Sequence, residues 1–306
     1  MFYSVPMRAA YREEPCRTAL NRVKGMGFRW SLNPYMGCAH RCAFCYVRGF
    51  ERRADRPSDD RYGTNIRVKT NVVEVLRIEL ARRGWRRERV AIGAATDPYQ
   101  PAEARYRLTR GCIQVLGAAR TPIDLITRGP LVVRDADVLA DAARRADVRV
   151  SVSIATLDES LSGRLEPGVA PPRQRLRAIR ILTDAGIAAG VALAPVLPGL
   201  TDAPADLAAV LRAARAAGAT HAWSNVLNLR GGTREHFMAV LEREWPSEVD
   251  RYRRLYPSGG PGYLRNADAG PIERRLAAVT RGAGIDDRRR VVLSPDPEPS
   301  QLALPI

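Results

Sequence analysis

The chain has 306 residues, which is long enough to bury one α/β barrel-like core. Its net charge of +16 favours a polyanionic partner. Its five cysteines are too few and too clustered for a disulfide framework, which favours a reducing compartment. No stretch reaches the roughly 18 apolar residues of a membrane helix, and the start lacks the apolar core of a signal peptide, so we expect a cytoplasmic protein with no membrane segment.

Residues 1–27 show no regular pattern, and we expect an irregular N-terminal extension there. From residue 28 onward, short apolar runs alternate with amphipathic stretches of helical period. The predicted strands are 28–33, 89–95, 122–127, 148–155, 187–196 and 220–227, and the predicted helices between them are 71–83, 105–119, 134–146, 171–185 and 203–217. Strands that alternate with helices form right-handed βαβ units around a parallel sheet. The predicted fold class is therefore α/β, with a partial (βα)6 barrel over residues 28–230.

The pattern changes after about residue 228 to charged helices, which are predicted at 233–245, 247–256 and 267–281. We therefore expect a helical C-terminal region over residues 231–290. The proline-rich residues 291–306 are expected to form a flexible tail.

Polar residues stand at the ends of the predicted strands, which is where folds of this type place their chemistry. They are Asn33, Thr96 with Asp97, Thr127 with Arg128, Ser151 with Ser153, and Ser224 with Asn225. We expect these side chains to meet at one edge of the sheet.

Three of the five cysteines, Cys38, Cys42 and Cys45, form the pattern CxxxCxxC after the first predicted strand. Thiolates at these offsets can wrap round one corner of an iron–sulfur cubane, each binding a separate iron. A 4Fe-4S cluster normally takes four cysteines, so three leave one iron open for a non-protein ligand. Zinc is the alternative, but a closed zinc site needs four ligands, and the loop residue His40 is expected to be exposed. A redox-active thiol pair would use only two of the three.

The stretch "CAHRCAFCY", with Phe44 just before the third cysteine, resembles the signature of the radical S-adenosylmethionine (SAM) superfamily. The resemblance implies that the open iron binds the amino and carboxylate groups of SAM. It further implies that an electron donor of the ferredoxin or flavodoxin type drives cleavage of SAM to a 5′-deoxyadenosyl radical, which abstracts hydrogen from a substrate.

A narrower resemblance covers roughly residues 28–230. The segments "ATDPYQPAE", "LITRGPLVVRD", "VSIATLDE", "RLEPGVAPPRQRLRAIRIL" and "APVLPGLTD" resemble the spore photoproduct lyase-like branch, in particular its actinobacterial-type members of unassigned substrate. By this resemblance Thr96 and Asp97 are candidates for contact with the amino group of SAM. Ser153 is the candidate for contact with its ribose or carboxylate.

The same resemblance places four more candidates around SAM. Arg164 and Glu166 follow in the loop after the fourth strand, and Val196 and Leu197 stand where an apolar contact with the adenine is expected.

One departure from this branch concerns the hydrogen-donating cysteine of its photoproduct-reversing members. Ala94 or Ala95 stands at that position, so reversal of the spore-type thymine dimer is not expected. Cys112 lies on an amphipathic stretch and is expected to be a buried structural thiol. Cys16 is expected to be inert, unless the N-terminal extension folds over the barrel mouth.

Two classes of function remain open on the sequence. The first is a radical SAM enzyme acting on a nucleobase in DNA or RNA, on a peptide or on a small metabolite. The alternative is a nucleic-acid-binding protein with a structural or redox-sensing iron–sulfur cluster. Basic runs at 48–56 and 81–89 favour an anionic substrate or a nucleic-acid strand in either class, and Trp85 is either a stacking platform or a helix-end anchor.

The last six residues, "QLALPI", resemble the hexapeptide by which bacterial polymerases and repair proteins dock on the sliding clamp. The resemblance implies a hydrogen bond from Gln301 and apolar contacts from Leu302, Leu304 and Ile306. Pro305 departs from that pattern because it fixes φ and lacks a donor N–H.

Overall fold

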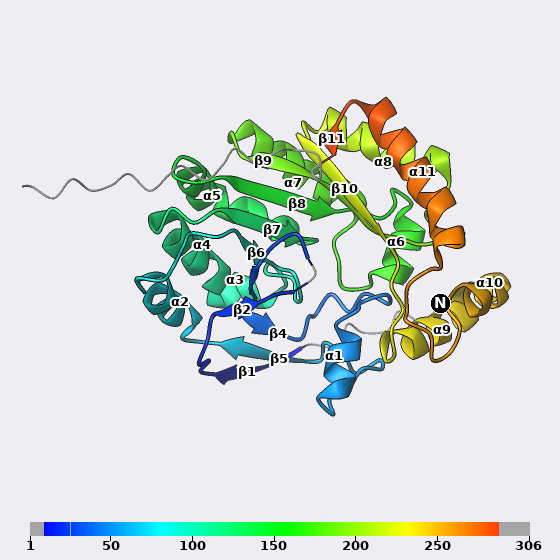
Figure 1. Ribbon diagram of the computed structural model, residues 1–306, viewed down its shortest axis with the longest axis horizontal. Coiled ribbons are helices and arrows are strands. Elements are labelled where there is room, and N and C mark those ends of the chain that lie inside the picture. Colours follow the sequence, from blue (N-terminus) through cyan, green and yellow to red (C-terminus); the bar gives the residue numbers. More distant parts are fainter. Residues whose placement is uncertain (1–8, 25, 288–306) are drawn as a thin grey trace, which may run out of the picture.

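A computed structural model describes residues 9–24 and 26–287 of the chain. Its main sheet has eight strands in the order β11-β10-β9-β8-β7-β6-β3-β2 (Figure 1). The six central strands are β3 (Trp30–Leu32), β6 (Val90–Ile92), β7 (Ile123–Thr127), β8 (Val148–Ser153), β9 (Ala188–Val196) and β10 (His221–Val226), and every neighbouring pair of them is parallel. These six confirm the predicted strands and the α/β fold class.

The strands are amphipathic because successive side chains point to opposite faces of the sheet. In β8, Val148, Val150 and Val152 belong to the main hydrophobic core, while Ser151 and Ser153 alternate with them on the other face. This alternation buries the apolar face of the strand under the helices and turns the polar face toward the inside of the partial barrel.

Helices follow the strands and cover the outside of the sheet. They are α2 (Val72–Leu80), α3 (Ala102–Tyr106), α4 (Leu108–Ala118), α5 (Ala136–Ala143) after the 3-10 helix η1 (Pro130–Asp135), α6 (Glu159–Leu165), α7 (Pro172–Asp184) and α8 (Pro204–Ala216). The predicted helix 105–119 is divided at Arg107, whose φ of 52° lies in the left-handed region and ends α3. In α7 and α8 a proline occupies the first helical turn, where its missing N–H has no partner to lose.

The prediction of an irregular N-terminal extension is wrong for the described residues. β1 (Ala10–Glu14) runs parallel to β5 (Asn65–Lys69), and β4 (Tyr35–Met36) pairs with the other side of β5. β2 (Leu20–Arg22) adds an antiparallel edge strand to the main sheet. β1 and β4 pair with a segment far away in the sequence, so local periodicity carries no sign of that pairing.

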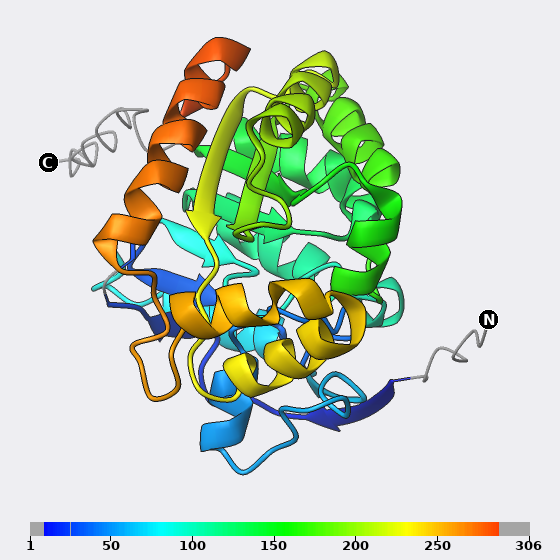
Figure 2. The same ribbon diagram turned by 90° about the vertical axis from the view of Figure 1, so that its right-hand side faces the viewer.

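The C-terminal helices α9 (Thr233–Glu244) and α10 (Val249–Leu255) lie across the cysteine-bearing part of the chain, as Figure 2 shows. α9 and α10 with its preceding 3-10 turn η2 (Pro246–Glu248) form a second core around Phe237 and Tyr252, whereas α11 (Asn266–Ala283) packs on α8 and leads into β11 (Asp286–Asp287). The helical C-terminal region is therefore present. The division at residues 28, 231 and 291 stays a prediction.

The predicted flexible tail and its sliding-clamp motif lie outside the described residues. In the described part of the chain, no helix is both long enough and apolar enough to span a membrane.

Candidate functional site

The three motif cysteines lie on the loop that joins β4 to α1 (Arg48–Arg53). Cys38 and Cys42 are buried and Cys45 is half-buried. The loop is tightly enclosed: a Cβ on Gly63, which has a φ of +79°, would stand 2.3 Å from the carbonyl oxygen of Cys38. The backbone N–H of Ala43 donates to the carbonyl of Leu165 at 2.8 Å, so the end of α6 also holds the loop.

The thiols of this loop share one low-dielectric environment. Burial raises the pKa of Cys42 well above its usual value, and the charges of Cys45 and Cys38 raise it further. Burial likewise raises the pKa of Cys45, with Cys38 next among the causes. A positive metal site would reverse this preference, because coordination deprotonates a thiol.

No group of three or more His, Cys, Asp or Glu side chains within residues 9–24 and 26–287 is gathered closely enough to hold a single metal ion. A cubane cluster does not require such convergence, since each thiolate binds its own iron. Three cysteines on one enclosed loop fit that donor set.

Gln100, in the segment "ATDPYQ", bonds the backbone on both sides of the first cysteine, Cys38. Its side chain is fully buried, accepts from the backbone N–H of Ala39 at 3.0 Å and donates to the carbonyl of Gly37 at 3.1 Å. The motif that we interpreted as a SAM contact therefore also holds the cysteine loop. The sequence offered no signal for this role, because the two segments are 61 residues apart.

The expectation that His40 is exposed is wrong. Its side chain is buried, and its Nδ1 lies 3.3 Å from Oδ2 of Asp97, close enough for an ion pair but not aligned as a hydrogen bond. Burial alone would lower the pKa of His40, but the Asp97 carboxylate and the Cys38 thiol raise it above its usual value. The loop folds inward because this imidazole meets a buried carboxylate.

Asp97 joins the loop after β6 to the end of β7. Its carboxylate accepts from Oγ1 of Thr127 at 2.6 Å, from the backbone N–H of Arg128 at 2.6 Å and from the backbone N–H of Tyr99 at 2.9 Å. Burial would raise the pKa of Asp97, but His40 and these donors lower it. Asp97 is thus a buried carboxylate already engaged by protein groups.

Thr96 is equally enclosed. Its Oγ1 donates to the carbonyl of Tyr35 at 2.7 Å, and its backbone N–H donates to the side chain of Asn33. These contacts bring the ends of β3 and β6 together, as we predicted for the polar strand ends.

Arg128 is the central cation of the strand ends. Its Nε donates to Glu166 at 2.8 Å, its Nη2 donates to the carbonyl of Ala194 at 2.6 Å, and its guanidinium lies 5.4 Å from the ring centroid of Phe44. Glu166 also pairs with buried Arg175 at 2.7 Å. Burial would raise the pKa of Glu166, but Arg175 and Arg128 lower it. Glu166 is therefore held between two arginines beside the cysteine loop.

Four remaining candidates divide into two groups. Ser153 ends β8 with a buried Oγ that has no hydrogen-bond partner, and Val196 and Leu197 are fully buried at the end of β9. Leu197 packs in the same core as Phe44. Arg164, by contrast, lies on α6 and is exposed, with its guanidinium stacked on Trp245.

A family model described as "Radical SAM superfamily" matches residues 32–209, more than half of the chain. The chain belongs to the radical SAM superfamily. That membership, by itself, implies an iron–sulfur cluster and SAM. The matched residues include the cysteine loop and the ends of β3, β6, β7, β8 and β9.

Relatives and solved structures agree with this membership. Uncharacterized proteins of Mycobacterium tuberculosis and Mycobacterium bovis are each 43% identical over 252 residues, which are 81% of this chain and 74% of theirs. An uncharacterized protein of Acidianus two-tailed virus is 29% identical over 224 residues, 69% of this chain and 71% of its own.

Among solved structures, a spore photoproduct lyase variant with bound AdoMet and dinucleoside spore photoproduct superposes with a TM-score of 0.67. The superposition covers 89% of this chain and 79% of the lyase at 17% identity, so it shows a shared fold. The resemblance to that branch is confirmed at the level of the fold.

The two cysteines outside the motif of this radical SAM protein lie elsewhere. Cys112 is fully buried in α4, as expected for a structural thiol, and burial raises its pKa. Cys16 is half-buried, and its backbone N–H and C=O both bond the side chain of Asn71. Trp85 is a helix-end anchor: it packs on Trp30 and its Nε1 donates to Thr121.

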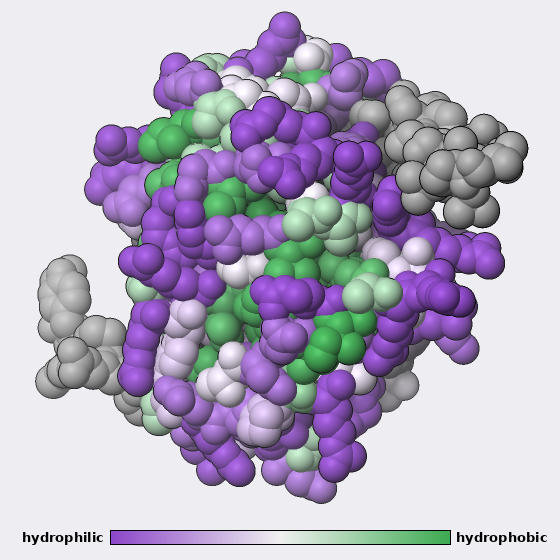
Figure 3. All heavy atoms as spheres, turned by 90° about the vertical axis from the view of Figure 1, so that its left-hand side faces the viewer, coloured by the Kyte–Doolittle hydropathy of each residue, from purple (hydrophilic) through white to green (hydrophobic). Residues whose placement is uncertain are grey.

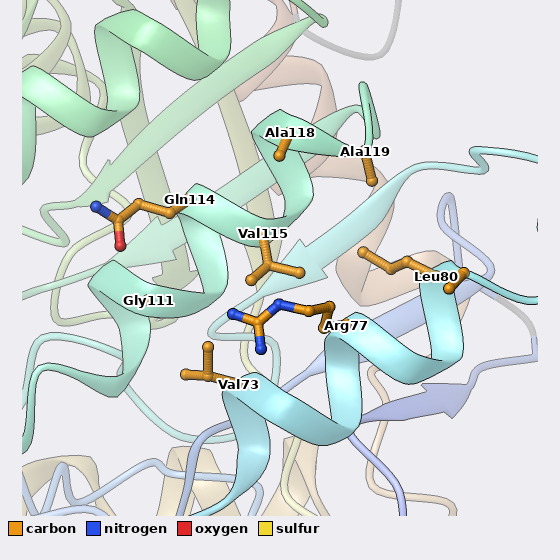
Figure 4. A pocket seen from close by; sticks show the side chains of 9 residues that line it. Val73, Arg77, Leu80, Gly111, Gln114, Val115, Ala118 and Ala119 are labelled. Atoms are coloured by element: carbon orange, nitrogen blue, oxygen red, sulfur yellow. The ribbon is translucent and has the colours of Figure 1, made fainter.

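An apolar groove of about 470 Å³ lies on the outer surface between α2 and α4 (Figure 4). Its side chains include Val73, Leu80 and Val115, and Figure 3 shows hydrophobic residues gathered on this side of the molecule. None of the candidate site residues lines it, so the groove is separate from the strand ends.

Proposed function

We propose that this chain is a radical SAM enzyme in which Cys38, Cys42 and Cys45 hold a 4Fe-4S cluster. When bound, that cluster would supply the electron for reductive cleavage of SAM, and the resulting 5′-deoxyadenosyl radical would abstract hydrogen from the substrate. The observation that carries the proposal is that three cysteines share one enclosed loop, which His40 and Gln100 hold against the strand ends.

In this proposal SAM lies against the carboxyl ends of the strands. Ser153 offers a buried hydroxyl with no protein partner, which suits a contact with the ribose or carboxylate of SAM. Val196 and Leu197 offer apolar surface for the adenine. Thr96 and Asp97 remain the proposed residues on the amino side of SAM, where their internal hydrogen bonds fix the backbone.

Two more groups shape this proposed pocket. Arg128 pairs with Glu166 beside Phe44, and Arg175 pairs with the same carboxylate, so the protein can exclude water there while this buried anion stays paired. Arg164 stands outside this group, on the exposed side of α6, and is not part of the proposed pocket.

The test is anaerobic reconstitution of the full chain with iron and sulfide. We expect about four irons per chain and a charge-transfer absorption that dithionite bleaches. Alanine at Cys38, Cys42 or Cys45 should abolish both, whereas the matched control Cys112→Ala should retain them. Stoichiometric zinc without iron uptake would contradict the proposal.

The added spectroscopic arm separates the two classes of function. SAM should perturb the spectrum of the reduced cluster if an iron is open to it. An unperturbed spectrum would favour a nucleic-acid-binding protein whose cluster is structural or redox-sensing.

We also propose a nucleobase in a DNA or RNA strand as the substrate. Among the described residues, the exposed large aromatic side chains are Tyr46, Phe50 and Tyr263. Tyr46 and Phe50 pack edge to face, and Phe50 carries the guanidinium of Arg53 at 4.7 Å from its centroid. Exposed rings with arginines suit base stacking and phosphate contact.

The rings of Tyr46 and Phe50 lie beside the cysteine loop. Tyr46 follows Cys45 directly, and its hydroxyl donates to the carbonyl of Ala94, which lies just after β6. A base stacked at Tyr46 would therefore stand near the proposed SAM site.

A further inference from the structure

Arg48, the first residue of α1, is a cation buried under the cysteine loop, with 1% of its surface exposed. Its guanidinium donates to the carbonyl oxygens of Ser58 at 2.9 Å and Asp59 at 2.6 Å. It also reaches the carbonyls of Cys42 at 3.4 Å and Arg41 at 3.3 Å. The side chain thus joins the cysteine loop to the segment that follows α1.

All of these acceptors are neutral carbonyl groups. Within the described residues, Arg48 forms no ion pair with a carboxylate, whereas the one other buried arginine there, Arg175, pairs with Glu166. A buried cation without a counter-charge is unfavourable, because the interior solvates it poorly. The groups near it that can become anionic are Cys45, Tyr62, Cys42 and Asp60, and of these Asp60 is largely exposed to water.

Tyr62 connects Arg48 to the third cysteine. The guanidinium lies 4.6 Å from the centroid of the Tyr62 ring, and the Tyr62 hydroxyl lies 3.6 Å from Sγ of Cys45. Tyr62 is 2% exposed, so both the cation and the hydroxyl act on the sulfur through a dry region. The sequence spacing of the cysteines gives no hint of this arrangement.

We propose that Arg48 and Tyr62 raise the reduction potential of the cluster that this loop binds. The inference rests on the proposed function. In the reduction, one electron passes from a reduced donor of the ferredoxin or flavodoxin type, which is oxidised, to the cluster, whose assembly with its thiolates becomes one charge more negative. A fixed cation and a hydroxyl donated to a ligand sulfur both favour the more negative state.

Neither residue is catalytic in this account, because neither touches SAM or the substrate. Arg48 acts through its charge and Tyr62 through its hydrogen bond to sulfur. A purely structural role would change the stability of the loop but leave the potential of the cluster unchanged.

The first experiment compares Tyr62→Phe with the matched control Tyr252→Phe in the reconstituted full chain. Tyr252 is also fully buried, and its hydroxyl has no hydrogen-bond partner. The readout is the midpoint potential from an anaerobic redox titration followed by absorbance and electron paramagnetic resonance. Tyr62→Phe should shift the midpoint to a more negative value, and Tyr252→Phe should leave it in place.

The second experiment isolates the charge. Arg48→Lys and Arg48→Gln both lose the forked guanidinium, but only Arg48→Gln loses the positive charge. At the wild-type midpoint, we expect the ratio of reduced to oxidised cluster to fall about tenfold in Arg48→Gln, which is about 59 mV for one electron. In Arg48→Lys, which keeps the positive charge, this ratio should fall clearly less than tenfold.

The outcomes separate the inference from the proposed function. If the wild type takes up no iron, the proposed function fails and the inference falls with it. If the wild type holds its cluster but Tyr62→Phe matches Tyr252→Phe, the inference alone is overturned. If both Arg48 variants fail to retain iron, the comparison of Tyr62→Phe with Tyr252→Phe still tests the inference. Tyr62→Phe keeps the aromatic ring that packs on Arg48.

Discussion

At the scale of single residues, the site is built from polar groups that are almost all engaged by one another. The carboxylate of Asp97 has three hydrogen-bond donors, and Glu166 is shared by Arg128 and Arg175. Ser153 is the exception among the candidates, since its buried Oγ has no partner in the described structure. Such a group is costly unless a ligand or water satisfies it.

The hydroxyl of Ser153 can therefore be removed with little loss of stability. We expect Ser153→Ala to keep its iron and its melting temperature but to bind SAM about threefold to tenfold more weakly, the range of one hydrogen bond. Calorimetric titration of the reconstituted protein measures the affinity. The matched control Ser162→Ala should lower the melting temperature, because Oγ of Ser162 accepts a hydrogen bond from Arg175 at 2.8 Å. An unchanged SAM affinity in Ser153→Ala would remove Ser153 from the proposed pocket.

The Glu166 carboxylate makes a pH-dependent contribution to stability. Burial would raise its pKa, but Arg175 and Arg128 lower it below the unfolded value of about 4.3. Its contribution is thus present above that value and is lost as the pH falls through the folded pKa. We expect Glu166→Gln to cost roughly 3–5 kcal/mol at pH 7, as for a broken buried pair. The difference from wild type should shrink in urea unfolding below about pH 4; a constant difference would contradict this assignment.

At the scale of elements, the cysteine loop is held by four separate segments. Gln100 grips its start, the carbonyl of Leu165 binds Ala43, and the turn at Gly63 closes over Cys38. On the side of α9, Oγ1 of Thr233 donates to the carbonyl of Cys45 at 3.1 Å. The loop is therefore positioned by segments that are far apart in the sequence.

The turn at Gly63 offers a direct test of that enclosure. Gly63 and Gly186 both have positive φ, but a Cβ on Gly186 meets nothing within 4 Å, whereas one on Gly63 would stand 2.3 Å from the Cys38 carbonyl. Gly186→Ala should cost about 1–2 kcal/mol and keep full iron uptake. Gly63→Ala should destabilise the chain further and lower its iron content. Equal iron content in the two variants would mean that the loop tolerates displacement at Cys38.

At the scale of the whole molecule, the charge of +16 bears on the proposed substrate. Many arginines are already paired, as Arg52 is with Glu235, but no carboxylate of the described residues pairs with Arg53 beside Phe50. The aromatic and basic surface next to the cysteine loop is consequently the part of the molecule best suited to a strand of nucleic acid.

Binding of a single-stranded oligonucleotide should weaken steeply as salt rises, because arginines displace counterions from phosphates. Phe50→Ala and Tyr263→Ala should each weaken binding by about 1–3 kcal/mol if bases stack there. Ile78→Ala, an exposed apolar residue on α2, is the matched control and should have no effect. Fluorescence anisotropy at several salt concentrations measures these affinities. Equal losses in all three variants would leave only a non-specific charge effect.

The sequence by itself determined the six parallel strands, most of the helices around them and the family. Period-2 and period-3.6 patterns are local, and the spacing of Cys38, Cys42 and Cys45 is a property of one short loop. The same locality explains why the C-terminal helices were predicted to within a few residues and why Cys112 was correctly assigned to a buried helix face.

Only the tertiary structure decided which polar groups meet. His40 turned inward to Asp97, Gln100 closed on the cysteine loop, and β1 paired with β5 across more than 50 residues of sequence. Arg48 reads in the sequence as one arginine of a basic run, and its burial without a carboxylate emerges only when the chain folds around it. A side chain finds its partner through space, and the free energy of burying it depends on that partner, so the sequence pattern alone does not fix it.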